Sequence, residues 1–185
     1  YFMASNYKMN DPEGVYFCSF ATVQWVDIFT RRCYKDLLVD NLRVCQEHKG
    51  LRLFAWVIMS NHVHLIAGVS KGNLASLLRD YKSYTSKQLY QAIKTEPESR
   101  REWMLPMFEK AGKYNPNNKH FQIWQQDNQP KVLLPYYDTF TKQKLNYIHQ
   151  NPVEAGWVDL PEDYTYSSAR SYCGMKGLLD VEFLR

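Results

Sequence analysis

The sequence predicts an α+β protein in which an antiparallel sheet carries helices on one face. Short runs rich in β-branched and aromatic residues alternate along the chain with longer segments whose apolar residues lie three and four apart. The length of 185 residues suits one well-buried domain, so we expect a single domain over residues 1–185. A composition of 45% hydrophobic and 23% charged residues is typical of a globular protein.

Three strands and two helices are expected in the first half of the chain. Residues 15–23 form a first strand, and residues 51–59 and 62–69 form a hairpin around a turn at Ser60 and Asn61. Between them a helix that ends at Gly50 presents one mainly apolar face at helical spacing, which consists of Tyr34, Leu37, Leu38, Asn41, Leu42 and Cys45. Asn73 can cap a second, basic helix whose apolar face is made of Leu74, Leu77, Leu78, Tyr81 and Leu89.

The second half is less regular. Residues 96–119 are polar and contain three prolines, which predicts a long connection or insertion with a short helix over 103–110. A fourth strand is expected over 120–124, and a helix over 139–150 that ends at Asn151-Pro152. The order strand, helix, strand, strand, helix, strand is that of the ferredoxin-like or RRM-like fold, to which the C-terminal helix is an addition. That fold supports many functions and indicates none by itself.

Charge and cysteine content set weaker limits. A formal net charge of +4 and a pI near 8.8 mildly favour an anionic partner. No Cys-x-x-Cys pair is present, so the four cysteines are interpreted as reduced core thiols: Cys18, Cys33, Cys45 and Cys173. No signal peptide or membrane-length apolar stretch is recognisable, which predicts a cytoplasmic protein with no membrane partner. Tyr1 and Phe2 precede Met3 and are interpreted as an expression remnant at the start of an N-terminal arm, residues 1–14.

Two histidines in the expected third strand form the first candidate site. Side chains alternate between the faces of a strand, so His62 and His64 point to one side and Val63 to the other. Two imidazole nitrogens on one side can hold a divalent ion and leave positions open for a substrate oxygen. A lone His-x-His pair is more often two half-exposed strand residues, so this motif alone leaves both interpretations open.

The second candidate site is a tyrosine and an asparagine in the last helix. Tyr147 and Asn151 lie four residues apart and therefore share a helix face. The carboxamide oxygen of Asn151 suits Mg²⁺ or Mn²⁺ and would complete a set of two nitrogens and one oxygen with the histidines. The alternative is that Tyr147 packs in the core and Asn151 only ends the helix before Pro152.

Taken together, the two motifs resemble those of a known family. His62-Val63-His64 is similar to the His-hydrophobic-His motif of single-tyrosine HUH transposases. Residues 147–158, YIHQNPVEAGWV, resemble the tyrosine segment of the REP-associated branch of that family, and residues 163–169, DYTYSSA, resemble the segment that follows it. The resemblance extends over residues 15–172. Members of this branch often carry an arginine-rich arm before the first strand, whereas Lys8 is the one basic residue in that segment here.

The resemblance implies an enzyme that cuts single-stranded DNA, often beside a hairpin, and leaves a 5′-phosphotyrosine link and a free 3′-hydroxyl. It implies Tyr147 as the nucleophile, His62 and His64 as ligands of Mg²⁺ or Mn²⁺, and Asn151 in the position of the third ligand. Relatives act as monomers or as homodimers, and both states are compatible with the sequence. Lysines on the two basic helices are expected to bind DNA phosphates: Lys82, Lys87, Lys142 and Lys144.

Two other classes of protein compete with this interpretation. The main alternative is a non-catalytic, domesticated nucleic-acid-binding module with the same fold, although the chain lacks the aromatic strand motif of an RRM. A structural zinc protein would need soft ligands near the histidines, such as a cysteine pair, and none is present. Covalent capture of DNA is the property that separates the enzyme from both.

Overall fold

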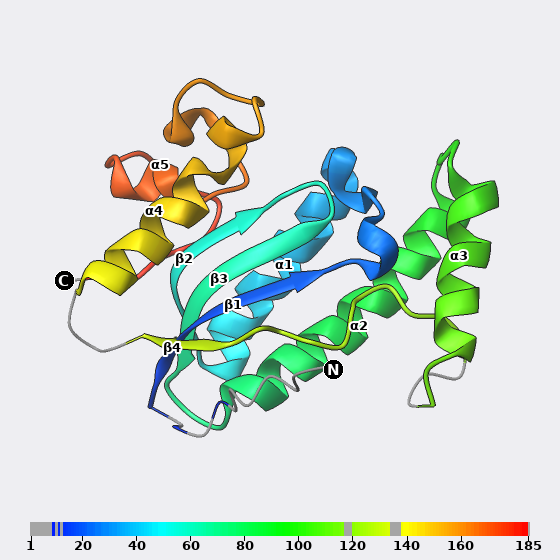
Figure 1. Ribbon diagram of the computed structural model, residues 1–185, viewed down its shortest axis with the longest axis horizontal. Helices are drawn as coiled ribbons and strands as arrows, with labels where there is room; N and C mark the ends of the chain where they lie inside the picture. The colour runs from blue at the N-terminus through cyan, green and yellow to red at the C-terminus, as the bar shows by residue number, and fades with distance from the viewer. Residues whose placement is uncertain (1–8, 10, 12, 117–119, 134–137, 185) are drawn as a thin grey trace, which may run out of the picture.

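A four-stranded antiparallel sheet forms the centre of the computed structural model, which describes residues 9, 11, 13–116, 120–133 and 138–184 (Figure 1). The strand order is β2-β3-β1-β4, as in the ferredoxin-like fold, so the predicted α+β architecture is confirmed. The strands are β1 (Val15–Ala21), β2 (Leu51–Ile58), β3 (His62–Val69) and β4 (Lys131–Leu133). Most of the predicted N-terminal arm lies outside the described residues.

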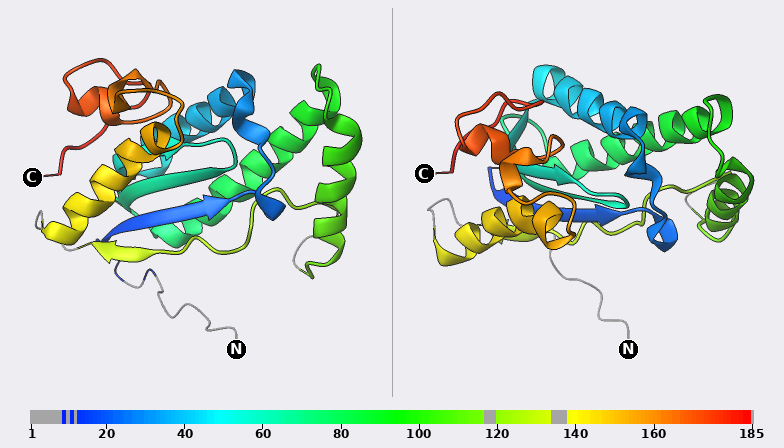
Figure 2. Two further views of the ribbon diagram at one scale, coloured as in Figure 1. Left: turned by 45° about the horizontal axis from the view of Figure 1, so that its top comes forward. Right: turned by 90° about the horizontal axis from the view of Figure 1, so that it is seen from above.

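Helices cover both faces of the sheet. The first two, α1 (Arg32–Lys49) and α2 (Leu74–Thr95), pack against each other and on one face. On the opposite face α4 (Thr139–Glu154) crosses β2 and β3, as the right-hand view of Figure 2 shows. A short helix α5 (Ala169–Tyr172) follows α4, and 3-10 turns occur at Val23–Trp25, Ile28–Thr30 and Pro161–Asp163. The two predicted helices on one face and the added C-terminal helix are thus all present.

The two helices on the first face form for the reasons that their sequences indicate. Every residue of the apolar face expected for α2 is buried, and Asn73 caps the helix by accepting a hydrogen bond from the backbone N–H of Ser76 at 3.0 Å. In α1 the buried positions are Tyr34, Leu38, Val39, Leu42 and Cys45. Gly50 ends α1 with a φ of 74°, a left-handed conformation that costs glycine little.

Alternation along β1 and β3 divides the core between the two layers. Phe20 of β1 contacts Tyr81 of α2, with ring centroids 6.2 Å apart, and pairs with Val63 of β3. Phe17, three residues earlier, contacts Tyr147 of α4 on the other face, with centroids 6.1 Å apart. Odd-numbered positions of β1 and even-numbered positions of β3 therefore face α4. This alternation carries both histidines of β3 to the face that α4 covers.

The expectation of a fourth strand over 120–124 is wrong, because β4 lies at Lys131–Leu133. The expected segment does run beside the end of β1, where Thr22 and Trp124 form an isolated bridge. Between Trp124 and β4, regular strand pairing with β1 is interrupted, because Pro130 has no N–H to donate and Gln129 adopts a φ of 42°. Sequence reasoning found the segment that covers the edge of β1 but not where regular pairing resumes.

The expected end of the last helix at Asn151-Pro152 is also wrong, because α4 continues to Glu154. Proline removes one helical hydrogen bond, which a helix tolerates near its end better than in its middle. The true end is at Gly156, whose φ is 71° and whose N–H donates to the Val153 carbonyl at 2.9 Å. Trp157 donates to the Pro152 carbonyl at 3.0 Å, which completes the Schellman pattern of a helix ended by glycine.

The polar stretch 96–119 contains more structure than a connection. Helix α3 (Arg101–Lys113) extends the short helix expected over 103–110, and its buried residues Met104, Phe108 and Gly112 recur every four positions. Lys119 lies outside the described residues. Gly112 lies against the backbone of Phe121, where a Cβ atom would approach Phe121 Cα to 2.5 Å, so only glycine fits there without a shift.

Two smaller expectations have different outcomes. All four cysteines are free, but Cys33 and Cys173 are exposed, so they are not the core thiols that were expected. Cys18 and Cys45 are buried as expected.

Within the described part of the chain, no helix has both the length and the apolar content needed to cross a bilayer.

Candidate active site

The two histidines of β3 and the tyrosine of α4 lie together on one face of the sheet. The ring centroids of His62 and His64 are 4.7 Å apart, and those of His64 and Tyr147 are 5.0 Å apart. The strand supplies the histidines because positions two apart share a face, and α4 supplies the phenol because it crosses that face. Residues that are 83 or more positions apart in the sequence are thereby brought within contact distance.

His64 is a buried imidazole with no polar partner. Its side chain stacks on Phe17, with centroids 5.5 Å apart, and only 4% of the residue is exposed. Neither ring nitrogen of His64 has a hydrogen-bond partner among the described residues. Burial, with smaller contributions from His62 and Lys144, lowers the pKa of His64 to about 3. The ring is therefore neutral at physiological pH, which is the form that binds metal ions.

His62 is half-buried and hydrogen-bonded to Asn61. Its Nδ1 lies 2.7 Å from the side-chain oxygen of Asn61, and the side chain of Asn151 lies near enough to affect its pKa. Burial lowers the pKa of His62, while the nearby Asn151 amide and the charge of Asp27 act in the opposite direction. Asn151, the expected third ligand, therefore lies near His62, one of the two expected histidine ligands.

The side chains of this site fit a divalent ion. Two neutral imidazoles and one carboxamide converge, and the unpartnered ring nitrogens of His64 are the kind of buried polar atom that a ligand would satisfy. In the described residues no group of three or more His, Cys, Asp or Glu side chains forms a metal cluster. A third protein ligand at this site would therefore be the amide oxygen of Asn151.

Tyr147 is accessible to a large substrate, since 40% of it is exposed. One turn earlier on α4, the ammonium of Lys144 lies 5.5 Å from the centre of the Tyr147 ring and 4.9 Å from that of Phe17. Partial burial lowers the pKa of Lys144, and the nearby charge of Lys131 adds to this effect. A phosphate that reached the phenol would meet this cation.

The segment after α4 holds the tyrosine helix in place. Residues 166–168 extend the edge of β2, where Ser167 and Val57 form an isolated bridge. His149, on a different side of α4 from Tyr147, places its Nε2 at 2.9 Å from the hydroxyl of Ser168. The segment that resembles the one following the tyrosine in the REP-associated branch therefore joins α4 to the sheet.

The burial of His149 predicts a loss of stability in acid that one substitution should reduce. Burial lowers the pKa of His149 from its usual 6.5 to about 4. Since the unfolded chain binds the proton more tightly, this residue destabilises the fold as the pH falls from 6.5 toward 4, and above 6.5 the penalty is absent. When the pH is lowered from about 7 to about 5, the free energy of unfolding should fall by a smaller amount in His149→Gln than in the wild type. The difference between the two falls should be up to about 2 kcal/mol. Urea denaturation at both pH values measures this, and equal losses would contradict it.

The four lysines expected to bind DNA do not lie together. Lys142 and Lys144 are on α4 with Tyr147, whereas Lys82 and Lys87 are on α2, which packs on the other face of the sheet. Lys87 is exposed and lines a hollow of about 690 Å³ between α2 and residues 120–128. Their role in DNA binding stays a prediction.

Lys82 is engaged within the protein. Its ammonium donates to the backbone oxygen of Gln125 at 2.7 Å and to the side chain of Asn128 at 2.8 Å. Burial lowers its pKa to about 8, against the opposing effect of Asp127. In this structure Lys82 fixes the segment that follows α3, and a DNA phosphate would have to compete with these bonds.

Several residues of the site were not anticipated from the sequence. Phe17 packs on both His64 and Tyr147, and the exposed indole of Trp25 meets His62 with ring centroids 5.9 Å apart. Phe17 could have been found by extending the period of two to β1, whose pairing with β3 places it on the same face. Trp25 carries no such signal, because it adopts a φ of 55° in a 3-10 turn.

Comparisons with known proteins identify a similar family and a similar fold. Residues 18–108 match the family described as "Transposase IS200 like", a range that contains His62 and His64 and ends before Tyr147. A solved structure of a REP-associated tyrosine transposase bound to a REP hairpin matches with a TM-score of 0.61 and 18% identity, and the match covers 99% of this chain and 94% of that one. At this identity the likeness demonstrates a shared fold. Among curated proteins, none matches the sequence.

Proposed function

The chain belongs to the family of IS200-like transposases, and on this premise we propose that it cuts and rejoins single-stranded DNA through a covalent bond to Tyr147. The observation that carries the proposal is the convergence of Tyr147, His64 and His62 on one face of the sheet, with neighbouring ring centroids 5.0 Å and 4.7 Å apart. This arrangement joins the two motifs that, taken separately, were open to structural interpretations.

In the proposed reaction, the hydroxyl oxygen of Tyr147 attacks the phosphorus of one phosphodiester. A bond forms between that oxygen and phosphorus while the bond from phosphorus to the 3′ oxygen breaks. The phenol gives up its proton and the departing 3′ oxygen takes one up, so the products are a 5′-phosphotyrosine and a free 3′-hydroxyl. Because the new link is still a phosphodiester, a later attack by a 3′-hydroxyl can rejoin DNA strands and release the tyrosine.

His62, His64 and Asn151 are the residues that would hold Mg²⁺ or Mn²⁺. When bound, such an ion supplies charge that polarises the scissile phosphate and stabilises its oxygens. The chain itself orients the reacting groups: β3 fixes the histidines, and α4 holds the phenol and the cation of Lys144 on the same side. The exposed indole of Trp25 offers a ring on which an unpaired base next to the cut could stack.

We further propose that the substrate is a single strand beside a hairpin and that one chain suffices for cutting. The structural neighbour is bound to a REP hairpin, which supports this class of substrate. Tyr147 contacts His64 of its own chain, so an active site can be assembled without a tyrosine from a second copy. A monomer working with its own tyrosine is therefore the simplest arrangement.

The test is covalent capture of DNA. The protein is incubated with Mn²⁺ and single-stranded oligonucleotides taken from the DNA that flanks its own gene, and the products are denatured and separated by electrophoresis. An adduct that survives denaturant and disappears on protease treatment supports the proposal. Binding without any adduct across these oligonucleotides would favour the non-catalytic module instead.

Lys144→Gln should slow cleavage more than it weakens DNA binding. The ammonium of Lys144 lies beside the Tyr147 ring, where it can stabilise negative charge on the reacting phosphate. Loss of that charge should lower the single-turnover rate of adduct formation by about 100-fold to 1,000-fold, as removal of one charge-stabilising donor typically does. Lys49→Gln, at the exposed end of α1, is the matched control and should react at the wild-type rate. Equal rates of adduct formation in both variants would show that Lys144 does not contribute to cleavage.

A further inference from the structure

The side chain of Asn61, in the β2–β3 turn, connects His62 to the loop that contains Trp25 and Asp27. Its amide nitrogen donates to the carbonyl oxygen of Trp25 and to a carboxylate oxygen of Asp27, each at 3.1 Å. Its amide oxygen lies 2.7 Å from Nδ1 of His62. Every polar atom of the Asn61 amide is therefore in use.

These bonds fix which way the amide points. A carbonyl and a carboxylate can only accept hydrogen bonds, so the amide nitrogen of Asn61 must face Trp25 and Asp27. Its oxygen must then face His62, and because that oxygen is an acceptor, Nδ1 of His62 must carry a proton. With the proton on Nδ1, the lone pair of the ring is on Nε2.

We propose that Asn61 and Asp27 are positioning residues that hold His62 in its Nδ1–H tautomer, so that Nε2 is the nitrogen presented to a metal ion. The inference rests on the proposed metal-dependent function for its purpose, though the tautomer itself exists without metal. Histidine ligands commonly donate their other ring N–H to an oxygen in this way, which orients the ring and makes it a better ligand. Asn61 supplies that oxygen, and Asp27 keeps the amide from turning over.

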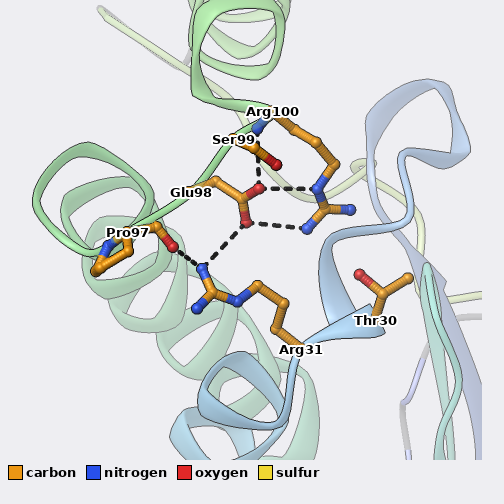
Figure 3. Close-up of a pocket in the computed structure, with 6 residues that line it drawn as sticks. All are labelled: Thr30, Arg31, Pro97, Glu98, Ser99 and Arg100. Carbon is orange, nitrogen blue, oxygen red and sulfur yellow. Dashed lines mark hydrogen bonds and ion pairs between the residues drawn. The ribbon is translucent and has the colours of Figure 1, made fainter.

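A buried carboxylate holds the loop that carries Asp27. Arg100 donates from Nη1 to the backbone oxygen of Asp27 at 2.7 Å, and its guanidinium pairs with Glu98 through bonds of 2.9 and 3.0 Å. Arg31 lies on the other side of the same carboxylate and also donates to the carbonyl of Pro97, as Figure 3 shows. Segment 97–100, which had no role assigned from its sequence, thus anchors the loop that contacts Asn61 beside β3.

The first measurement follows the tautomer in metal-free protein. Histidine side chains are labelled with ¹⁵N, and long-range ¹H–¹⁵N spectra distinguish the protonated ring nitrogen from the bare one. In the wild type, His62 should carry its proton on Nδ1. In Asn61→Leu, which keeps the bulk of the side chain but offers no acceptor, the population should move toward the Nε2–H form. Asn41→Leu, which removes a hydrogen-bonded amide from α1, is the control and should leave His62 unchanged.

The second measurement follows Mn²⁺ affinity by electron paramagnetic resonance. Asn61→Leu should bind Mn²⁺ about 10- to 100-fold more weakly, as loss of such a supporting partner typically does. Asn61→Asp combined with Asp27→Asn exchanges donor and acceptor between the two positions. It should restore the Nδ1–H tautomer of His62 and recover part of the Mn²⁺ affinity. The recovery should be partial because the carbonyl of Trp25 still lacks its hydrogen-bond donor.

The outcomes separate this inference from the proposed function. If Asn61→Leu keeps the wild-type tautomer, the positioning role is overturned, whatever the protein's activity. If the wild type shows the Nδ1–H tautomer but binds no Mn²⁺, the metal-dependent function fails while the hydrogen-bond arrangement stands. Circular dichroism of each variant shows whether it is folded, and the paired Asn61→Asp, Asp27→Asn protein provides a second reading if Asn61→Leu does not fold.

Discussion

Replacing Tyr147 with phenylalanine should abolish the covalent DNA adduct while leaving DNA binding nearly unchanged. The substitution keeps the ring that packs on Phe17 and His64 and deletes the one oxygen that is proposed to attack phosphorus. Affinity for a single strand comes from phosphate contacts and base stacking spread over many residues, so the dissociation constant should change by less than about 3-fold. Adduct formation, measured on denaturing gels, should fall by at least about 10³-fold.

The control for this experiment is another exposed tyrosine. Tyr84 lies on α2, on the other face of the sheet, and 58% of it is exposed. Tyr84→Phe should therefore form adduct at the wild-type rate. An adduct of unchanged yield in Tyr147→Phe would show that a different tyrosine of the fourteen is the nucleophile.

Periodicity in the sequence predicted most of the fold and the shared face of the candidate site residues. A period of two placed His62 and His64 on one face of β3, where the structure has both rings directed toward α4. A period near four placed the buried faces of α1 and α2, and the spacing of Tyr147 and Asn151 placed both on one face of α4. These features depend on local geometry, which residue spacing records directly.

The features that sequence reasoning missed depend on tertiary contacts. The strand β4 forms where the chain meets the edge of β1 again, and nothing in residues 131–133 distinguishes them from a loop. Gly112 packs against Phe121, and Glu98 is buried between two arginines. The spacing of residues in the sequence does not indicate that these positions are close in space. The partners of His62 in the loop at Asp27 belong to the same class.

The end of α4 was missed for a different reason. A proline in the last turn removes a single backbone bond and leaves the preceding turns intact, whereas the glycine four residues later adopts the left-handed conformation that ends the helix. The position of Asn151 on the helix is unaffected, and the added residues extend α4 past it to Glu154. On α4, Asn151 lies near His62, where it raises the pKa of that histidine against the effect of burial.

The site also has a cost in stability that a mutation can expose. His64 is buried without a partner for either ring nitrogen, and an unpaired buried polar group typically costs about 1–3 kcal/mol. A protein under selection for stability alone would place an apolar residue at this position. An unpartnered ring nitrogen of His64 is expected if that nitrogen binds a ligand only when the site is occupied.

His64→Leu should therefore make the metal-free protein more stable and inactive at the same time. Leucine has a similar volume and no polar atom to bury, so the free energy of unfolding in urea should rise by about 1 kcal/mol. Mn²⁺ binding and adduct formation should both be lost, since one of the three proposed ligands is gone. His62→Leu is the matched comparison: it should also abolish metal binding, but without the gain, because His62 is hydrogen-bonded to Asn61 at 2.7 Å. Loss of stability in His64→Leu together with wild-type Mn²⁺ affinity would show that His64 is a packing residue and not a ligand.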